Sequence, residues 1–132
     1  MKQAPFLFSE TQFRVIRLEY SSESFGNAIM VLEDEDLRIE FVKDRGQIFL
    51  DFQAPTTKHP HKNWFSIDIV KQKITGKIAT SSEIIPENIE FLRNNLEEIK
   101  DLFSPSKLDD TLGKLDQLQR DRAKRMFSKR KS

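Results

Sequence analysis

The stretch from Leu37 to Phe52 limits what this chain can fold into more than any other. Apolar residues alternate with polar or charged ones on both sides of a short connection, Asp44-Arg45-Gly46. Alternation of this kind places every second side chain on one face, which is typical of a half-buried β-strand. Gly46 tolerates the positive φ that a bulged hairpin turn needs. The stretch therefore predicts an antiparallel β-hairpin. The side chains expected to face the core are those of Leu37, Ile39, Phe41, Ile48, Leu50 and Phe52.

Two further strands are expected ahead of this hairpin. Residues 12–20 carry alternating apolar side chains, and residues 26–32 form a more continuous apolar run that suits a central strand. Polar turns at residues 21–24 and 33–36 would connect these strands to each other and to the hairpin. We therefore predict a meander of four antiparallel strands.

The segment from Trp64 to Gly76 fits two structures. Strand alternation runs through Phe65, Ile67 and Ile69, while an apolar stripe that begins at Trp64 has helical spacing. A glycine is common directly after the last turn of a helix, where it takes a left-handed conformation. The helical spacing and the closing Gly76 therefore favour a helix.

A longer helix is expected from Pro86, because proline suits the first turn and Glu87 suits the positive end of the helix dipole. Its apolar stripe runs to Phe103, and Ser104-Pro105 ends it. A second helix is expected to begin near Ser106. Because so short a break separates the two helices, they should pack as an antiparallel hairpin.

These elements predict an α+β fold, in which an antiparallel four-stranded meander packs with a short helix and a C-terminal helical hairpin. The length of 132 residues fits one domain with a single hydrophobic core. Residues 1–119 would form this domain, and residues 120–132 a basic helix end or tail.

The chain contains no cysteine, which excludes a disulfide framework, a thiolate metal site and a thiol nucleophile, and fits a reducing compartment. The first residues include an apolar run of only three, shorter than a secretory signal or a membrane helix requires. We therefore expect a soluble, cytoplasmic protein that does not contact the membrane.

Charge is divided unevenly along the chain, although the overall net charge is only +1. Residues 120–132 hold seven basic side chains against Asp121 alone, a net charge of +6. The remaining residues, 1–119, hold 15 basic and 20 acidic side chains, a net charge of −5. An acidic body joined to a basic end often marks an interaction surface, or a tail that meets an acidic partner.

No residue pattern points to a catalytic or metal centre. His59 and His61 lie in a loop, and two histidines without cysteine fall short of the ligands that a metal site needs. Asp51 and Asp68 could act as a general acid and base, but their spacing does not single them out among 21 acidic residues. The chain has neither a Gly-x-Ser-x-Gly elbow nor a glycine-rich phosphate loop. We therefore expect no enzymatic activity, no metal and no cofactor.

Two turns are candidate contacts with a partner protein. One is the run of four carboxylates Glu33, Asp34, Glu35 and Asp36, whose mutual repulsion a cationic partner would relieve. The other is Arg45 at the hairpin tip, where its guanidinium could bind a partner's carboxylate or phosphate. Each turn also has a plain structural explanation, namely a solvated turn and an ordinary exposed corner.

The basic C-terminal segment is a candidate nucleic-acid contact, because basic side chains bind the phosphate backbone by releasing its counterions. Phe127 is its one residue suited to stacking on bases, and no helix-turn-helix or zinc-finger framework surrounds it. The segment could equally be solvated or dock on its own acidic body. The basic side chains concerned are those of Arg120, Arg122, Lys124, Arg125, Lys129, Arg130 and Lys131.

The strand-turn-strand of residues 37–52, with Trp64 opening an amphipathic segment, resembles small bacterial immunity proteins of contact-dependent inhibition and polymorphic toxin systems. The resemblance covers roughly residues 12–76, and its sharpest elements are Asp44-Arg45-Gly46 and Trp64. It implies a protein that neutralises a cognate toxin by binding it, without catalysis of its own. It carries over no binding residue. An acidic body would be steered towards the basic cleft of a toxin that acts on nucleic acid.

The principal hypothesis is therefore a protein-binding antagonist, whose contact surface includes the four carboxylates of residues 33–36. A nucleic-acid-binding accessory protein that uses residues 120–132 is the first alternative. A structural or oligomerisation domain, which pairs through an edge strand or through its helices, is the second.

Overall fold

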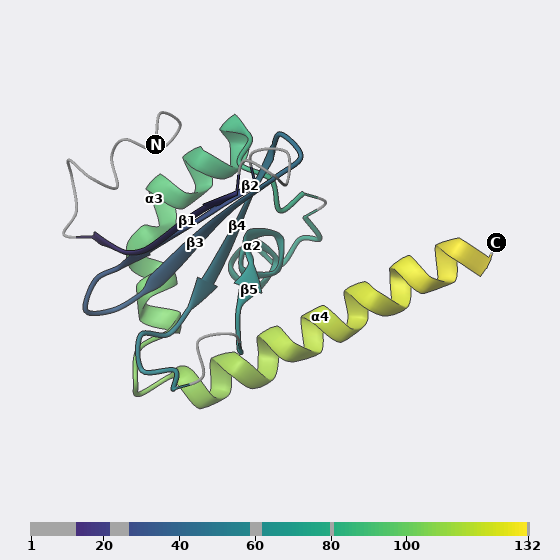
Figure 1. Cartoon of the computed structure of the whole chain (residues 1–132). Helices are drawn as coiled ribbons and strands as arrows, with labels where there is room; N and C mark the ends of the chain where they lie inside the picture. Colours follow the sequence, from purple (N-terminus) through teal and green to yellow (C-terminus); the bar gives the residue numbers. More distant parts are fainter. Residues whose placement is uncertain (1–12, 22–26, 59–61, 80, 132) are drawn as a thin grey trace.

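The computed structural model describes residues 13–21, 27–58, 62–79 and 81–131. Its strands form a single sheet in the order β1-β2-β3-β4-β5, and every neighbouring pair is antiparallel (Figure 1). The first four follow the order of the chain, so the predicted four-stranded meander is confirmed, and a short fifth strand extends it. The strands are β1 (Arg14–Ser21), β2 (Asn27–Glu33), β3 (Arg38–Asp44), β4 (Gln47–Gln53) and β5 (Phe65–Ser66).

The alternation of side chains along β3 and β4 gives the sheet two different faces. Ile39 lies opposite Phe52, and Phe41 opposite Leu50, and all four side chains are buried as predicted. They belong to the inner face, which packs against α2 (Ile67–Thr75) and α3 (Pro86–Leu102) in one hydrophobic core. Burying each such side chain contributes roughly 1.5–3 kcal/mol to folding. The opposite face, called the outer face below, has few core residues and several charged ones.

The turn between β3 and β4 is tighter than the sequence suggested. Asp44 pairs directly with Gln47, so only Arg45 and Gly46 connect the two strands. Both have a positive φ, of 52° and 85°, as a two-residue type I′ turn requires. The expected bulged connection is therefore replaced by a regular hairpin, in which Arg45 as well as Gly46 adopts the left-handed region.

The ambiguous segment after Trp64 contains both of the structures that its pattern allowed. Phe65 and Ser66 form β5 opposite Phe52 and Asp51, and the chain then continues directly into α2. Gly76 ends the helix with a φ of 75° and donates its amide to the carbonyl oxygen of Gln72. The preference for a helix is thus confirmed for residues 67–75.

The helix from Pro86 is confirmed as α3, with Pro86 in its first turn. Leu92, Leu96 and Ile99 are buried in the core on one side of this helix. The last helix, α4 (Leu108–Lys131), does not fold back along α3 as predicted. It packs instead against α2, and Figure 1 shows it leading away from the sheet. The prediction that the last two helices form an antiparallel hairpin was therefore wrong, although the predicted α+β class is correct.

The basic end of the chain is continuous with the rest of α4, which runs through residues 119 and 120 without a break. The buried side chains of Thr111 and Leu115 anchor its first half. Its second half extends beyond the body of the molecule (Figure 1). None of the helices in the described part of the chain combines the length and the apolar character needed to cross a membrane.

Candidate protein-binding surface

The two edges of the sheet differ. At the β4 edge, the second half of β4 pairs with β5. The first half of β4 is covered by residues 82–84, which make two main-chain hydrogen bonds to it. The amide of Leu50 donates to the carbonyl oxygen of Ser82 at 3.1 Å, and that of Ile84 to Ile48 at 2.7 Å. At the other edge, no strand among the described residues pairs with the side of β1 that points away from β2. An unpaired strand presents amide and carbonyl groups to which another chain can bind.

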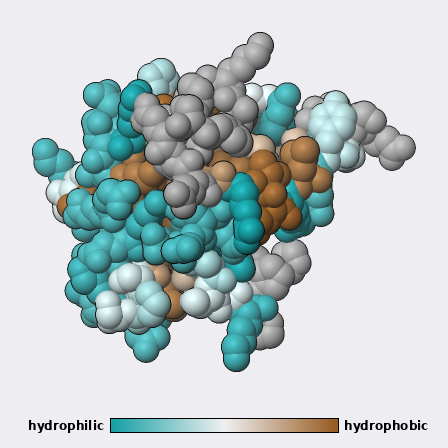
Figure 2. All heavy atoms as spheres, turned by 90° about the vertical axis from the view of Figure 1, so that its left-hand side faces the viewer, coloured by the Kyte–Doolittle hydropathy of each residue, from teal (hydrophilic) through white to brown (hydrophobic). Residues whose placement is uncertain are grey.

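Strand β1 also exposes more apolar surface than any other strand of the described chain. Leu18 and Tyr20 are 69% and 70% exposed, and they lie opposite Met30 and Ala28 on the inner face. Their side chains therefore extend the apolar face past its covered part to the edge of the sheet. Figure 2, which views the side of the molecule where β1 lies, shows apolar surface among hydrophilic side chains. The unpaired side of β1 is called the open edge below; its exposed apolar residues are Val15, Ile16, Leu18 and Tyr20.

An irregularity protects only the first part of this edge. The register between β1 and β2 shifts between Val15 and Arg17, which leaves Ile16 without a partner on β2. Bulges and charged side chains are two devices that discourage pairing at edge strands. From Arg17 to Ser21 the pairing with β2 is regular. Residues 17–21 are therefore the part of the open edge best shaped to accept another strand.

The four carboxylates predicted to contact a partner fall into two pairs. Glu33 accepts a hydrogen bond from the guanidinium of Arg38 at 2.7 Å. Asp34 is ion-paired with Lys100 of α3 at 2.6 Å, and its side chain is only 8% exposed. Its other oxygen accepts hydrogen bonds from the two amides of residues 36 and 37. These two acids hold the turn in place, whereas Glu35 and Asp36 are exposed.

Arg45, the other predicted contact, lies at the opposite end of β3 from the acidic turn. Its amide donates to the side-chain oxygen of Asn27 at 3.0 Å, which fastens the hairpin tip to the start of β2. A shallow cleft of about 380 Å³ lies beside this tip. The strand β1 runs between the two places, because Arg14 pairs with Glu33 and Ser21 pairs with Asn27. The cleft is lined by Glu19, Tyr20, Ser21, Asn27, Ala28, Ile29, Val42, Lys43 and Asp44.

The outer face of the sheet carries carboxylates that are only partly compensated. Glu40 lies opposite Asp51, and both side chains are half-buried. Burial, followed by the charges of Glu40 and Asp68, raises the pKa of Asp51 to about 6, although Arg122 opposes this. Burial likewise raises the pKa of Glu40, against the opposing charge of Arg17. A cation placed on this face would therefore interact favourably with both carboxylates.

Asp68, the other acid considered for catalysis, is buried and engaged by α4. Its carboxylate accepts a hydrogen bond from Arg122 at 2.7 Å and another from the hydroxyl of Ser66. The same guanidinium donates to the Ser66 hydroxyl oxygen at 3.0 Å. The structure thus brings Asp51 and Asp68 near each other, but it commits Asp68 to holding α4 against α2 and β5.

The remaining basic side chains of α4 have different environments. Arg120 is ion-paired with Asp116 at 3.3 Å, one helical turn away. Lys124 is exposed and Arg125 is half-buried. For Lys129, Arg130 and Lys131 the structure describes the helical backbone alone. The predicted nucleic-acid contact therefore lies on a single helix, and one of its members, Arg122, is used internally.

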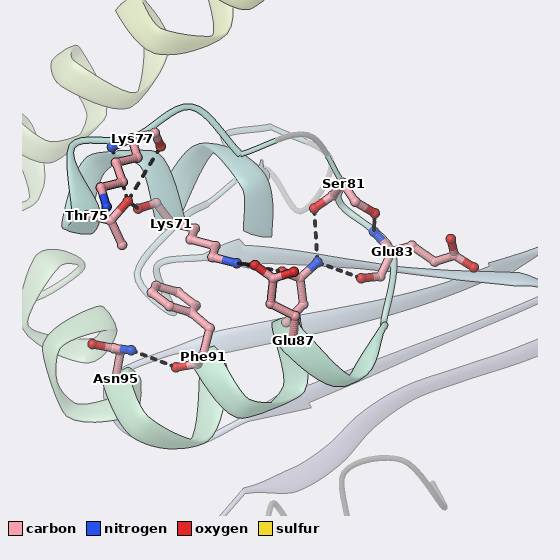
Figure 3. Close-up of polar contacts among 9 residues, drawn as sticks. Lys71, Thr75, Lys77, Ser81, Glu83, Glu87, Phe91 and Asn95 are labelled. Carbon is pink, nitrogen blue, oxygen red and sulfur yellow. Dashed lines mark hydrogen bonds and ion pairs between the residues drawn. The ribbon is translucent and has the colours of Figure 1, made fainter.

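A second, polar cleft of about 410 Å³ lies between the end of α2 and the start of α3 (Figure 3). Lys71 points into it, with its amine 2.9 Å from a Glu87 oxygen and 5.7 Å from the centre of the Phe91 ring. Buried Asn88 donates to the carbonyl oxygens of Ser81 and Glu83 at 3.0 and 2.8 Å. These contacts join the two helices to the residues beside β4. An anionic ligand would have to displace Glu87 from Lys71, so we regard this cleft as structural.

Within the described residues, no three histidine, cysteine, aspartate or glutamate side chains are placed to hold a metal ion. His59 and His61 lie outside the residues that the structure describes.

The open edge is a functional candidate that the sequence reasoning did not locate. Pairing through an edge strand was its last alternative, but that role was not assigned to residues 12–20, which were predicted only to form a strand. Two signals were available: the first strand of a meander lies at an edge, and Ile16, Leu18 and Tyr20 place apolar side chains where a solvated edge would carry polar ones.

Comparison with protein-family models, curated proteins and solved structures finds no match to this chain.

Proposed function

We propose that this chain is a non-catalytic protein-binding module that antagonises its partner, and that the partner docks on the open edge. The observation that supports this best is that no described strand pairs with one side of β1, a strand in which Leu18 and Tyr20 are more than two-thirds exposed. Main-chain groups at such an edge give affinity, and apolar side chains beside them give specificity.

The binding mode that we propose is strand addition. An extended segment of the partner would pair with residues 17–21 and would place alternate side chains against Leu18 and Tyr20. Glu35 and Asp36 would meet basic side chains of the partner near the start of β1. Arg45 would meet an acidic one near its end. The predicted contacts that remain exposed thus lie at opposite ends of the sheet, in the turn between β2 and β3 and in the turn between β3 and β4.

The specific form that we propose is a bacterial immunity protein that acts in the cytoplasm and neutralises a cognate toxin. The net charge of −5 on residues 1–119 supports it, because a toxin that acts on nucleic acid presents a basic cleft. Opposite charges accelerate association, by roughly tenfold to a thousandfold at low ionic strength.

The proposal is tested by capturing partners from the native cell with the wild-type chain and with two matched variants. Leu18→Lys places a charge on the open edge, and Ile78→Lys makes a comparable change at an exposed apolar residue (58%) elsewhere. Both should leave the free energy of unfolding within about 0.5 kcal/mol of wild type, because exposed substitutions rarely matter more. We expect Leu18→Lys to lose the captured protein and Ile78→Lys to retain it.

Equal capture by both variants would remove the open edge from the interface. A wild-type chain that captures nothing beyond the empty matrix would contradict protein binding altogether. If the captured protein is toxic when expressed alone, co-expression of the wild-type chain should restore growth and co-expression of Leu18→Lys should not. A captured protein without toxicity would leave the binding module intact but would rule out the immunity role.

A further inference from the structure

The end of α4 has no role in the proposed binding at the open edge. Arg122 joins this helix to the body through hydrogen bonds to Asp68 and Ser66. Beyond it, the helix leads away from the sheet in Figure 1. Met126 and Phe127 lie on this part with 55% and 60% of their surface exposed. Residues 123–131 are called the arm below.

The arm is strongly basic and contains no acidic residue. A basic helix that also exposes a methionine and a phenylalanine suits a surface with carboxylates and apolar side chains together. Phosphate binding alone would have no use for the two apolar side chains. The basic side chains of the arm are Lys124, Arg125, Lys129, Arg130 and Lys131.

The outer face of the sheet has the matching composition. Glu40 and Asp51 lie side by side on β3 and β4, and Glu19, which is ion-paired with Arg17 at 2.9 Å, lies on β1 at the same face. Half-buried Ile29, Val42 and Phe49 continue the cross-strand row of Glu19, next to the row that holds Glu40 and Asp51. Burial raises the pKa of Glu40 and of Asp51 against the opposing charges of Arg17 and Arg122 respectively, so a further cation would interact favourably with both carboxylates. Because the arm leads away from the sheet, it does not cover this face of its own chain (Figure 1).

We propose that two copies of this chain exchange arms, so that the arm of each lies on the Glu40–Asp51 region of the other copy's outer face. The charges support a second copy as the occupant, because residues 1–119 carry −5 and the five basic side chains of the arm carry +5. Reciprocal exchange about a two-fold axis uses both arms and both faces, and therefore closes into a dimer. Met126 and Phe127 would cover the apolar side chains beside the carboxylates.

Sedimentation velocity of the full chain tests this at two salt concentrations. The Debye length falls from about 14 Å in ~50 mM NaCl to about 4 Å in ~500 mM NaCl, so the arm contacts should weaken at high salt. We expect a dimer in low salt whose dissociation constant rises at least about tenfold in high salt. A chain that stays monomeric in low salt at micromolar concentrations would overturn the proposal.

A charge swap tests which surfaces meet. The arm variant K124E/R125E and the face variant Glu40→Lys should each be monomeric, because each brings like charges together. An equimolar mixture of the two should form a heterodimer, because the reversed arm then meets the reversed face and the native arm meets the native face. Two monomeric variants whose mixture stays monomeric would contradict the proposal, as would a dimer that survives both changes. Leu18→Lys, which alters only the open edge, should remain dimeric, so this result is independent of the proposed function.

Nucleic acid is the competing occupant of the arm. A wild-type chain that is monomeric and binds a ~20-base-pair duplex in a salt-dependent manner, with binding lost in K124E/R125E, would assign the arm to phosphate contacts and would overturn the exchanged dimer. Matched thermal unfolding of the arm variant and the wild type checks that the helix is retained.

Discussion

Asp51 shows how a single side chain can set the pH response of this fold. It sits on the outer face opposite Glu40, and burial raises its pKa from an ordinary 3.8 to about 6. The folded state therefore binds this proton more tightly than the unfolded state does. Its contribution to stability is fully present below about pH 4 and is lost as the pH rises through 6. The full difference corresponds to about 3 kcal/mol at most.

Asp51→Asn should accordingly raise the free energy of unfolding at pH 8 by about 1–2 kcal/mol, because the side chain can no longer ionise. At pH 4 the variant should be close to wild type. Urea denaturation at the two pH values measures both quantities, with the exposed-site variant Glu97→Gln as the control for a simple loss of charge. If Asp51 instead made the wild type more stable at pH 8 than at pH 4, relative to the Asp51→Asn variant, the account would be contradicted.

At the residue scale the sequence could predict which side chains are buried but not which charges are paired. Ile39, Phe41 and Leu50 follow from local alternation. The pairing of Asp34 with Lys100, and of Asp68 with Arg122, joins residues far apart in the chain. Nothing in the spacing of an acidic run separates Asp34, which is held by α3, from Asp36, which is exposed.

At the scale of elements, the β3–β4 turn contains a glycine that suits a tight turn and an arginine that does not. Both turn residues adopt a positive φ, which asparagine and glycine tolerate better than other residues. Arginine at the first position is therefore a costly choice, of about 1 kcal/mol relative to a residue suited to the left-handed region. A contact between Arg45 and a partner would explain why arginine occupies this position.

Arg45→Asn should raise the free energy of unfolding by about 0.5–1 kcal/mol, because an Asn-Gly pair suits a type I′ turn. The same change should weaken capture of the partner. Arg45→Lys keeps the charge and the unfavourable φ, so its stability should equal that of wild type. Thermal unfolding gives the first effect and the capture assay the second. A stabilised variant with undiminished capture would reduce Arg45 to an exposed corner.

The strands and helices themselves were predictable where their patterns are local. The hairpin of residues 37–52 and the helix from Pro86 follow from side-chain period, turn residues and proline placement. The segment after Trp64 changes from strand to helix within a few residues, so each pattern was partly correct. The direction of α4 depends on Arg122 reaching Asp68 and on packing against α2, which no local pattern contains.

At the scale of the whole molecule, the structure separates three surfaces. The inner face is covered by α2 and α3, the outer face carries carboxylates, and β1 leaves one edge unpaired among the described residues. The sequence predicted an acidic body and a basic end, but it could not show that the basic end of α4 leads away from the sheet (Figure 1). The two proposed contacts, a different protein at the open edge and another copy at the arm, therefore use separate surfaces.

The most direct test of the central claim is amide hydrogen exchange of β1, measured by mass spectrometry on the free chain and on its complex with the captured partner. Strand addition would give new hydrogen bonds to those amides of residues 17–21 that point away from β2, so their exchange should slow by at least about tenfold in the complex. The exposed side of α3 should exchange as before. Unchanged exchange throughout β1, with protection confined to other elements, would contradict binding at the open edge.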